Sequence, residues 1–162
     1  MSTLWKEQKV SFSEVRARHT NNPMDIKVKK LKPDARLPSY AHPGDVGLDL
    51  YSLEDKSLKP GERHIFFVGF ALEFPTGYAA IVKDKGGTSK NGLHTAGGVY
   101  DAGYRGEYNV NLVNLSDKEY QVKKGDKIAQ LVIFPVAIAN LTEVAELNDS
   151  SRGEGRFGST GR

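Results

Sequence analysis

The sequence contains no cysteine, which excludes disulfide bonds, thiolate chemistry and a cysteine-based zinc site. The four histidines, His19, His42, His64 and His94, show no metal-ligand spacing. No apolar run approaches the length of a membrane span, and the N-terminus lacks the apolar region of a signal peptide. The net charge is only +3, with lysines scattered along the chain. We therefore expect an intracellular protein that binds no membrane and no nucleic acid directly, while a small polyanion remains a compatible ligand.

Long stretches with helical periodicity are also missing, and short runs of strand-forming residues take their place. Proline and glycine turns separate these runs, which is typical of an all-β sandwich or barrel. The expected strands cover residues 26–29, 44–51, 65–74, 78–83, 108–112, 127–135 and 139–144. The alternation in the first of them predicts a half-buried strand. One helical turn fits residues 88–91. A chain of 162 residues, 38% of them hydrophobic, suits one domain with a sizeable core.

The two ends of the chain depart from the strand pattern. Residues 1–23 are polar and aperiodic, so we interpret them as a flexible N-terminal appendage to a β-barrel that spans residues 24–147. Residues 148–162 are rich in glycine, and their composition alone predicts a disordered tail. The same glycines, hydroxyls and arginines would also suit an arm that closes over a phosphorylated ligand, with Phe157 stacked on a base.

The stretch from Gly97 to Tyr108 is the most informative in the sequence. Turn residues between two apolar runs predict a β-hairpin there. Its tip carries the carboxylate of Asp101, the phenol of Tyr104 and the guanidinium of Arg105 within five residues. Paired glycines before the first strand allow a flat group to approach the backbone closely. Taken alone, the stretch could still be a plain hairpin with ordinary turn residues.

Polar side chains interrupt several apolar strands. Asn109 and Asn111 share one face, which predicts a wet or inter-subunit surface, although a plain solvent face fits the spacing equally well. Gln130 is the one amide in its apolar run, where an edge position or a satisfied core position is usual. Asp49 is likewise an acidic residue among apolar ones.

Five separated stretches resemble, in order, the five motifs of the trimeric dUTPases, which are dUTP diphosphatases. These stretches are HPGDVGLDLYS, KDKGGTSKNGLH, GGVYDAGYRGEY, KGDKIAQL and RGEGRFGSTG, and the resemblance covers residues 25–161. It implies a small jelly-roll-like β-barrel of the β-clip type that forms a homotrimer, with each active site built from three chains. The implied activity is hydrolysis of dUTP to dUMP and pyrophosphate, which keeps uracil out of DNA and supplies dUMP for dTMP synthesis. The implied location is the cytoplasm, the nucleus or a virus-infected host cell.

The resemblance also implies a role for individual residues. Asp101 would be the general base that activates the attacking water, and Asp49 would hold Mg²⁺ through a water molecule. The base and sugar would contact Gly98, Val99, Tyr100, Tyr104 and Phe157. The phosphates would contact Lys85, Gly86, Gly87, Ser89, Gln130, Arg152, Gly158, Ser159 and Thr160. A water, a base and charge neutralisation suffice for such a hydrolysis, so the residue types agree with the implied chemistry.

The second motif departs from the family pattern. The family usually has Arg-Ser-Gly where this chain has Lys85-Gly86-Gly87. A lysine keeps the positive charge but loses the bidentate fork, and glycine has no hydroxyl, although Ser89 lies close by in sequence. Two alternatives therefore stay open. One is a deaminase of the related dCTP branch, whose glutamate base would stand at Asn111, and the other is a weakened homologue that senses nucleotides or binds a partner protein.

Overall fold

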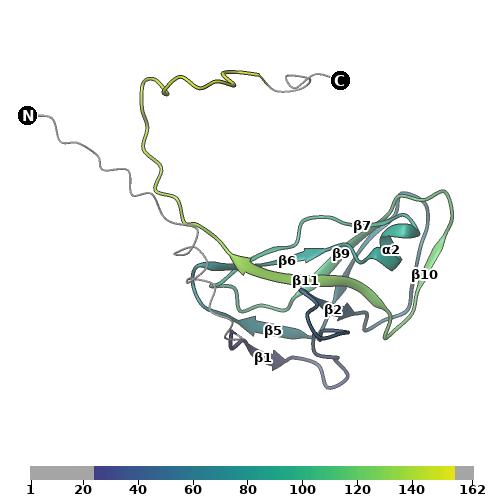
Figure 1. Cartoon of the computed structure of the whole chain (residues 1–162). Helices are drawn as coiled ribbons and strands as arrows, with labels where there is room; N and C mark the ends of the chain where they lie inside the picture. Colours follow the sequence, from purple (N-terminus) through teal and green to yellow (C-terminus); the bar gives the residue numbers. More distant parts are fainter. Residues whose placement is uncertain (1–23, 156–162) are drawn as a thin grey trace, which may run out of the picture.

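Strands dominate the computed structural model, which describes residues 24–155 (Figure 1). The strands are β1 (Lys27–Lys30), β2 (Gly47–Tyr51), β3 (Lys56–Leu58), β4 (Arg63–Phe67), β5 (Phe70–Glu73), β6 (Tyr78–Lys83), β7 (Leu93–Thr95), β8 (Val99–Asp101), β9 (Asn109–Asn114), β10 (Tyr120–Val122) and β11 (Lys127–Pro135). The short helix α2 (Gly86–Lys90) falls close to the predicted helical turn. The all-β prediction is confirmed. Within residues 24–155, no helix has the length and apolarity to cross a membrane.

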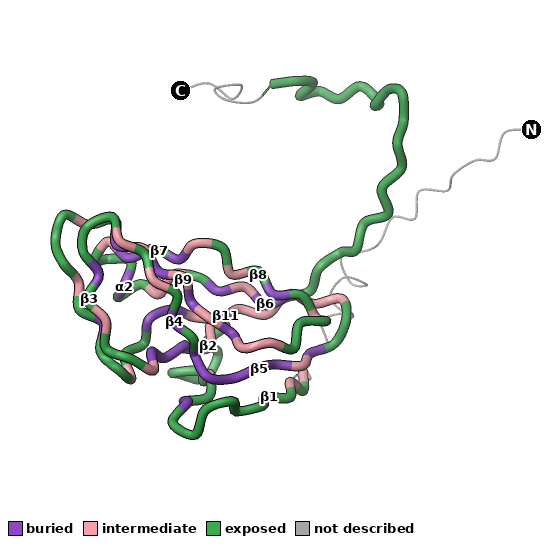
Figure 2. The backbone as a smooth tube through the Cα atoms, turned by 180° about the vertical axis from the view of Figure 1, so that it is seen from behind, coloured by how far each residue is buried: buried purple, intermediate pink, exposed green. Residues whose placement is uncertain are grey.

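The strands form four small antiparallel sheets around one core. The largest has the order β2-β11-β6-β8, and a second has the order β4-β9-β7. The pairs β1-β5 and β10-β3 complete the set. The buried residues that pack together come from nearly all of these strands, as Figure 2 shows. Phe66, Phe70 and Tyr108 are fully buried large side chains of this core.

The stretch from Gly97 to Tyr108 is not a paired hairpin, so this prediction was wrong. Strand β8 pairs only with β6, whereas β9 pairs with β4 and β7 in another sheet. The hydroxyl of Tyr100 replaces the missing ladder, because it donates to the Asn109 carbonyl at 2.9 Å and accepts from the Asn109 N–H at 3.0 Å. The rings of Tyr100 and Tyr108 stack with centroids 4.1 Å apart. The two strands therefore splay apart and are joined by side chains rather than by backbone.

Three other strand predictions need correction. The run 65–74 is divided between β4 and β5, because Gly69 turns the chain with a φ of +76° where Ala35 leaves no room for a Cβ. Strand β1 is exposed along its whole length instead of half-buried, since it pairs only with β5 at the margin of the fold. Residues 139–144 form no strand, because they run away from the body of the molecule without a neighbouring strand (Figure 1).

The buried tyrosines of the core predict opposite responses to loss of a hydroxyl. The Tyr108 hydroxyl is buried without a hydrogen-bond partner among the described residues, and burial raises its pKa. We expect Tyr108→Phe to leave the free energy of unfolding within about 1 kcal/mol of wild type or to raise it. The matched control Tyr100→Phe removes two hydrogen bonds and should lower it by about 1–3 kcal/mol. Denaturant titration at one fixed protein concentration measures both, and a larger loss in Tyr108→Phe would contradict the packing described.

Candidate active site

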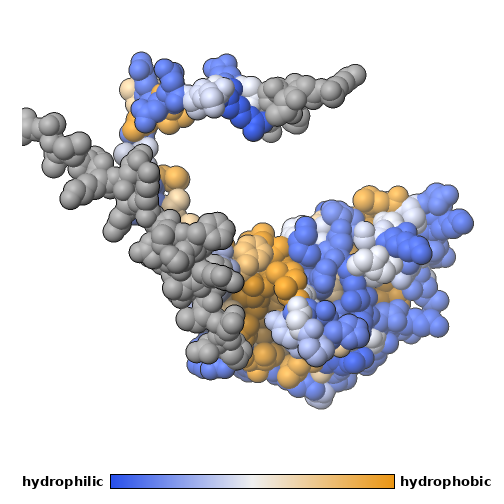
Figure 3. Space-filling view, viewed as in Figure 1, coloured by the Kyte–Doolittle hydropathy of each residue, from blue (hydrophilic) through white to orange (hydrophobic). Residues whose placement is uncertain are grey.

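The outer face of the four-stranded sheet carries polar residues at both ends and apolar residues between them. Residues opposite one another in an antiparallel ladder share a face, so the ladder defines three successive rows. The rows are Asp49, Gln130 and Lys83; then Gly47, Val132, Ile81 and Val99; then Phe134, Ala79 and Asp101. Val99 of the middle row is 66% exposed and Phe134 of the third row is 37% exposed, so apolar side chains of this face are left uncovered within one chain. Figure 3 shows hydrophobic side chains gathered on the side of the molecule where β11 ends.

A polar pocket of about 280 Å³ lies at the first row. It is lined by Asp45, Val46, Gly47, Asp49, Lys85 and Gln130. A Cβ at position 47 would overlap the Gln130 Oε1 atom, so a larger residue there would displace the Gln130 amide. The Gln130 amide donates to the Asp84 carbonyl at 2.8 Å, which fixes its orientation beside the pocket. The structure thus brings together residues from the first, second and fourth of the five stretches.

Asp49 is the most buried charge of this pocket. Its side chain is 3% exposed, and its two oxygens lie 2.7 Å from Lys85 Nζ and 2.6 Å from Lys127 Nζ. Burial alone would raise the pKa of Asp49, but Lys127 and Lys85 outweigh it and hold the pKa below its ordinary value. The carboxylate is therefore ionised: Oδ1 accepts a hydrogen bond from Lys85, and Oδ2 forms an ion pair with Lys127 that lacks hydrogen-bond geometry.

The segment that leads into α2 is fixed by Asp84, which sequence reasoning missed. The Asp84 carboxylate accepts hydrogen bonds from the backbone N–H and the hydroxyl of Thr95, both at 2.6 Å, and it contacts His94 Nδ1 at 2.6 Å. Burial alone would raise the pKa of Asp84, but the hydrogen bonds from Thr95 and the contact with His94 outweigh it and lower the pKa. Gly86, Gly87 and Ser89 follow on the helix, exposed and outside the pocket lining. The role of Ser89 as a substitute for the missing serine hydroxyl therefore stays a prediction.

Strand β8 presents an open edge, because it is the last strand of its sheet and β9 does not pair with it. The Gly98 carbonyl accepts from the Val82 N–H at 2.8 Å. Since partners alternate along an antiparallel ladder, the backbone of Tyr100 also faces β6, whereas Val99 and Asp101 face the open edge. The edge therefore offers the Val99 N–H, the Val99 carbonyl and the Asp101 N–H. The Asp101 carbonyl is taken by the Tyr104 N–H at 3.0 Å.

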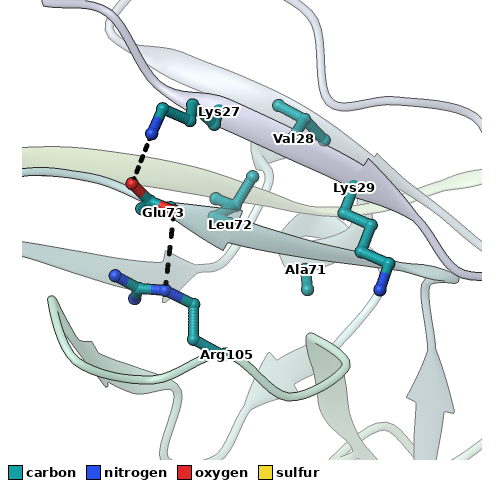
Figure 4. A pocket seen from close by; sticks show the side chains of 7 residues that line it. All are labelled: Lys27, Val28, Lys29, Ala71, Leu72, Glu73 and Arg105. Atoms are coloured by element: carbon teal, nitrogen blue, oxygen red, sulfur yellow. Dashed lines mark hydrogen bonds and ion pairs between the residues drawn. The ribbon is translucent and has the colours of Figure 1, made fainter.

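The turn after β8 is held rigid by its own side chains. Arg105 Nη1 donates to the carbonyls of Ala102 at 2.6 Å and Tyr104 at 3.0 Å, and the Tyr104 hydroxyl donates to the Glu107 carbonyl at 3.1 Å. Arg105 also reaches the β1-β5 pair, where its Nε lies 3.9 Å from a Glu73 oxygen (Figure 4). Tyr104, 39% exposed, is therefore presented beside Asp101 in a defined position.

One chain does not bring all the predicted site residues together. Asp101 and Gln130 share a face but lie two strands and four residues apart, which corresponds to about 16 Å. Arg152 lies in the exposed segment that leaves the body after β11, where its Nε donates to the Gly155 carbonyl (Figure 1). Phe157, Gly158, Ser159 and Thr160 lie outside the described residues, as do residues 1–23.

A metal ion would find a limited set of ligands here. Within residues 24–155, no group of three or more histidine, aspartate or glutamate side chains could hold an ion. The pocket is lined by two carboxylates, Asp45 and Asp49. Magnesium is commonly bound by one or two carboxylates together with substrate phosphates and waters. The residues therefore fit Mg²⁺ only as a partner of a phosphorylated ligand.

Comparison with known proteins gives one consistent result. A family model described as dUTPase matches residues 33–161. The deoxyuridine 5'-triphosphate nucleotidohydrolase of Clostridium tetani is 47% identical over 141 residues, covering 85% of this chain and 97% of the relative. The enzyme of the same name from Thermobifida fusca is 50% identical over 141 residues, covering 84% and 78%.

Solved structures agree with these relatives. The dUTPase of Staphylococcus bacteriophage 80alpha bound to dUPNHPP has a TM-score of 0.79 and 31% identity, covering 88% of this chain and all of that one. A dUTPase of phage phi11 of S. aureus, described as coordinating a structural Mg(II) ion, has a TM-score of 0.72 and 28% identity, covering 77% and 99%.

The open edge of β8 depends on Gly98, which predicts a difference between two neighbouring glycines. Gly97 and Gly98 both have positive φ, but only at Gly98 would a Cβ meet another residue, 2.8 Å from Val82 Cβ. We expect Gly97→Ala to cost about 1 kcal/mol of unfolding free energy and Gly98→Ala to cost at least about 1 kcal/mol more. Denaturant titration of the two variants tests this. Equal losses would mean that β8 does not pack against β6 as described.

Proposed function

The chain belongs to the dUTPase family, and from this we propose that it hydrolyses dUTP to dUMP and pyrophosphate through attack of water on the α-phosphorus. The observation that carries the proposal is the outer face of the four-stranded sheet. It presents the pocket with Asp49 and Gln130 at one end and Asp101 at the other. Because dUTP is a nucleotide of the cell interior, we infer that the enzyme works in the cytoplasm, the nucleus or a virus-infected host cell.

Uracil fits the open edge of β8. The edge offers a donor, an acceptor and a donor from Val99 and Asp101, whereas uracil offers an acceptor, a donor and an acceptor from O2, N3–H and O4. Cytosine has an unprotonated N3, which would face the Val99 carbonyl and leave it unpaired. Gly98 and Tyr100, whose backbone groups face β6, would hold this edge in position. Tyr104 would lie against the deoxyribose, where it leaves no space for a 2′-hydroxyl.

Asp101 is the proposed general base. Its carboxylate is exposed beside the open edge, and no described residue donates a hydrogen bond to it, so it can orient a water and accept its proton. A positioned base of this kind, together with charge neutralisation, is sufficient for phosphoanhydride hydrolysis. Asn111 lacks the acid–base chemistry of a glutamate, which argues against the deaminase alternative.

The phosphate chain would occupy the pocket near Lys85. Lys85, Gly86, Gly87, Ser89 and Gln130 are the proposed contacts on the body. Arg152, Gly158, Ser159 and Thr160 of the arm 148–162 would close over the phosphates, and Phe157 would stack on the base. When bound, Mg²⁺ would neutralise charge on the phosphates beside Asp49. The barrel 24–147 and the arm 148–162 are then two functional parts of one domain, with residues 1–23 as an appendage.

Catalysis on a single phosphorus atom requires the two ends of the face to meet. About 16 Å separates Asp101 from Gln130 within one chain, whereas catalytic groups act within about 3–3.5 Å of the reacting atoms. Exposed apolar residues lie between the two ends, as expected for a surface that packs against another copy. We therefore propose a homotrimer in which one chain supplies Asp101 and another supplies Lys85 and Gln130.

The role of Asp101 is tested by Asp101→Asn, which keeps the shape and turn preference of the side chain but cannot accept a proton. We expect kcat for dUTP to fall roughly 10²- to 10⁴-fold, with little change in the affinity for a non-hydrolysable dUTP analogue. Steady-state kinetics and calorimetry on the same preparation measure both quantities. Unchanged turnover would place the base elsewhere.

Shared sites are tested by mixing two disabled variants, Asp101→Asn and Lys85→Ala, after joint refolding. If each site takes the two residues from different chains, about a quarter of the sites in a random one-to-one mixture carry both native residues. The mixture should therefore recover about a quarter of wild-type activity. Each variant refolded alone is the control. No recovery in the mixture would show that both residues act within one chain.

A further inference from the structure

Two lysines compensate the charge of Asp49, and each contacts a different oxygen of its carboxylate. Lys85 Nζ contacts Oδ1 and Lys127 Nζ contacts Oδ2, at 2.7 and 2.6 Å. Only Lys85 lines the pocket, together with Asp49 itself and Gln130. Lys127 therefore holds the carboxylate from outside the volume in which a phosphate chain would lie.

The backbone directs Lys127 to this position. In the ladder, Gln130 stands opposite Asp49, and Lys127 stands opposite Tyr51. The register shifts between Lys127 and Ala129, and such an irregularity re-aims a side chain relative to the regular pleat. The Arg36 guanidinium covers the Tyr51 ring, with its Cζ atom 4.0 Å from the ring centroid. The irregularity in β11 thus directs Lys127 toward Asp49, although the Lys127 side chain is 41% exposed.

Lys85 cannot serve Asp49 and a phosphate equally well. To contact an incoming phosphate closely, its ammonium group has to leave the carboxylate. A buried carboxylate that loses its only counter-charge is strongly destabilised, so the release of Lys85 depends on a second cation that stays. Lysine suits this exchange, because it is a single charge on a flexible stem, whereas arginine would bind the carboxylate through a rigid fork.

We propose that Lys127 is a positioning residue for triphosphate binding: it keeps Asp49 neutralised and thereby allows Lys85 to move from Asp49 to the phosphate chain. This inference rests on the proposed function and deepens it. It also explains how the second motif works with Lys85 in place of arginine. Lys127 itself touches no phosphate.

The test measures binding of inorganic tripolyphosphate by calorimetry, in EDTA, to the full-length protein. In Lys127→Met, Asp49 retains Lys85, so the affinity should fall on the order of 10-fold or more. Lys127→Arg should restore most of it. The double variant Asp49→Asn/Lys127→Met has no carboxylate to retain Lys85. Its affinity for tripolyphosphate should therefore equal that of the single variant Asp49→Asn. With dUTP, Lys127→Met should raise KM far more than it lowers kcat.

Binding of dUMP distinguishes a failure of the proposed function from a failure of the positioning role of Lys127. All variants should bind dUMP as wild type does, since its base and sugar contact the edge of β8 and it has no β- or γ-phosphate to draw Lys85 away from Asp49. If wild type failed to bind dUMP, the proposed function itself would be overturned, and this inference with it. If dUMP binds normally but Lys127→Met binds tripolyphosphate as wild type does, the positioning role is overturned. Equal weakness of Lys127→Met and the double variant would overturn it as well, because Lys127 would then contact phosphate directly.

Discussion

The hydroxyl of Tyr100 bonds to both backbone groups of Asn109, and the architecture of the site depends on this contact. Burial raises the pKa of Tyr100, so the hydroxyl stays protonated and can both donate and accept. It connects two strands that belong to different sheets without a backbone ladder between them. The edge of β8 therefore remains open, and its donor–acceptor–donor pattern is available for a base. A regular hairpin would have used these backbone groups for pairing and left no open edge at β8.

The outer face of the four-stranded sheet imposes the second constraint. Its rows place the pocket beside Asp49 and the Asp101 side chain on the same face, two strands and four residues apart. In the row between them Val99 is exposed and Val132 and Ile81 are only partly buried in one chain, which favours contact of this face with another copy. In the proposed homotrimer, assembly and catalysis would therefore be coupled through a single surface.

The sequence predicted the all-β class and most strand positions, because alternation and turn residues act locally. It also singled out Asp49 and Gln130 as polar residues among apolar neighbours and Asp101 as a carboxylate at a turn, and their roles in a site stay predictions. Pairing between distant strands could not be predicted, so the hairpin was wrong and the break at Gly69 was missed. Lys127 and Asp84 were missed for a related reason: their partners, Asp49, Thr95 and His94, are brought near only by the folded sheets. Residues 139–144 carry a strand pattern but lack a neighbouring strand in one chain.

A crystal structure with a non-hydrolysable dUTP analogue and Mg²⁺ would test most directly whether the two half-sites meet only between copies. We expect the α-phosphorus to lie between the Asp101 carboxylate of one chain and the Gln130 amide of another, with uracil paired to the Val99 backbone. A single chain that supplies both Asp101 and Gln130 to the same ligand, or a ligand bound away from the edge of β8, would contradict the shared site.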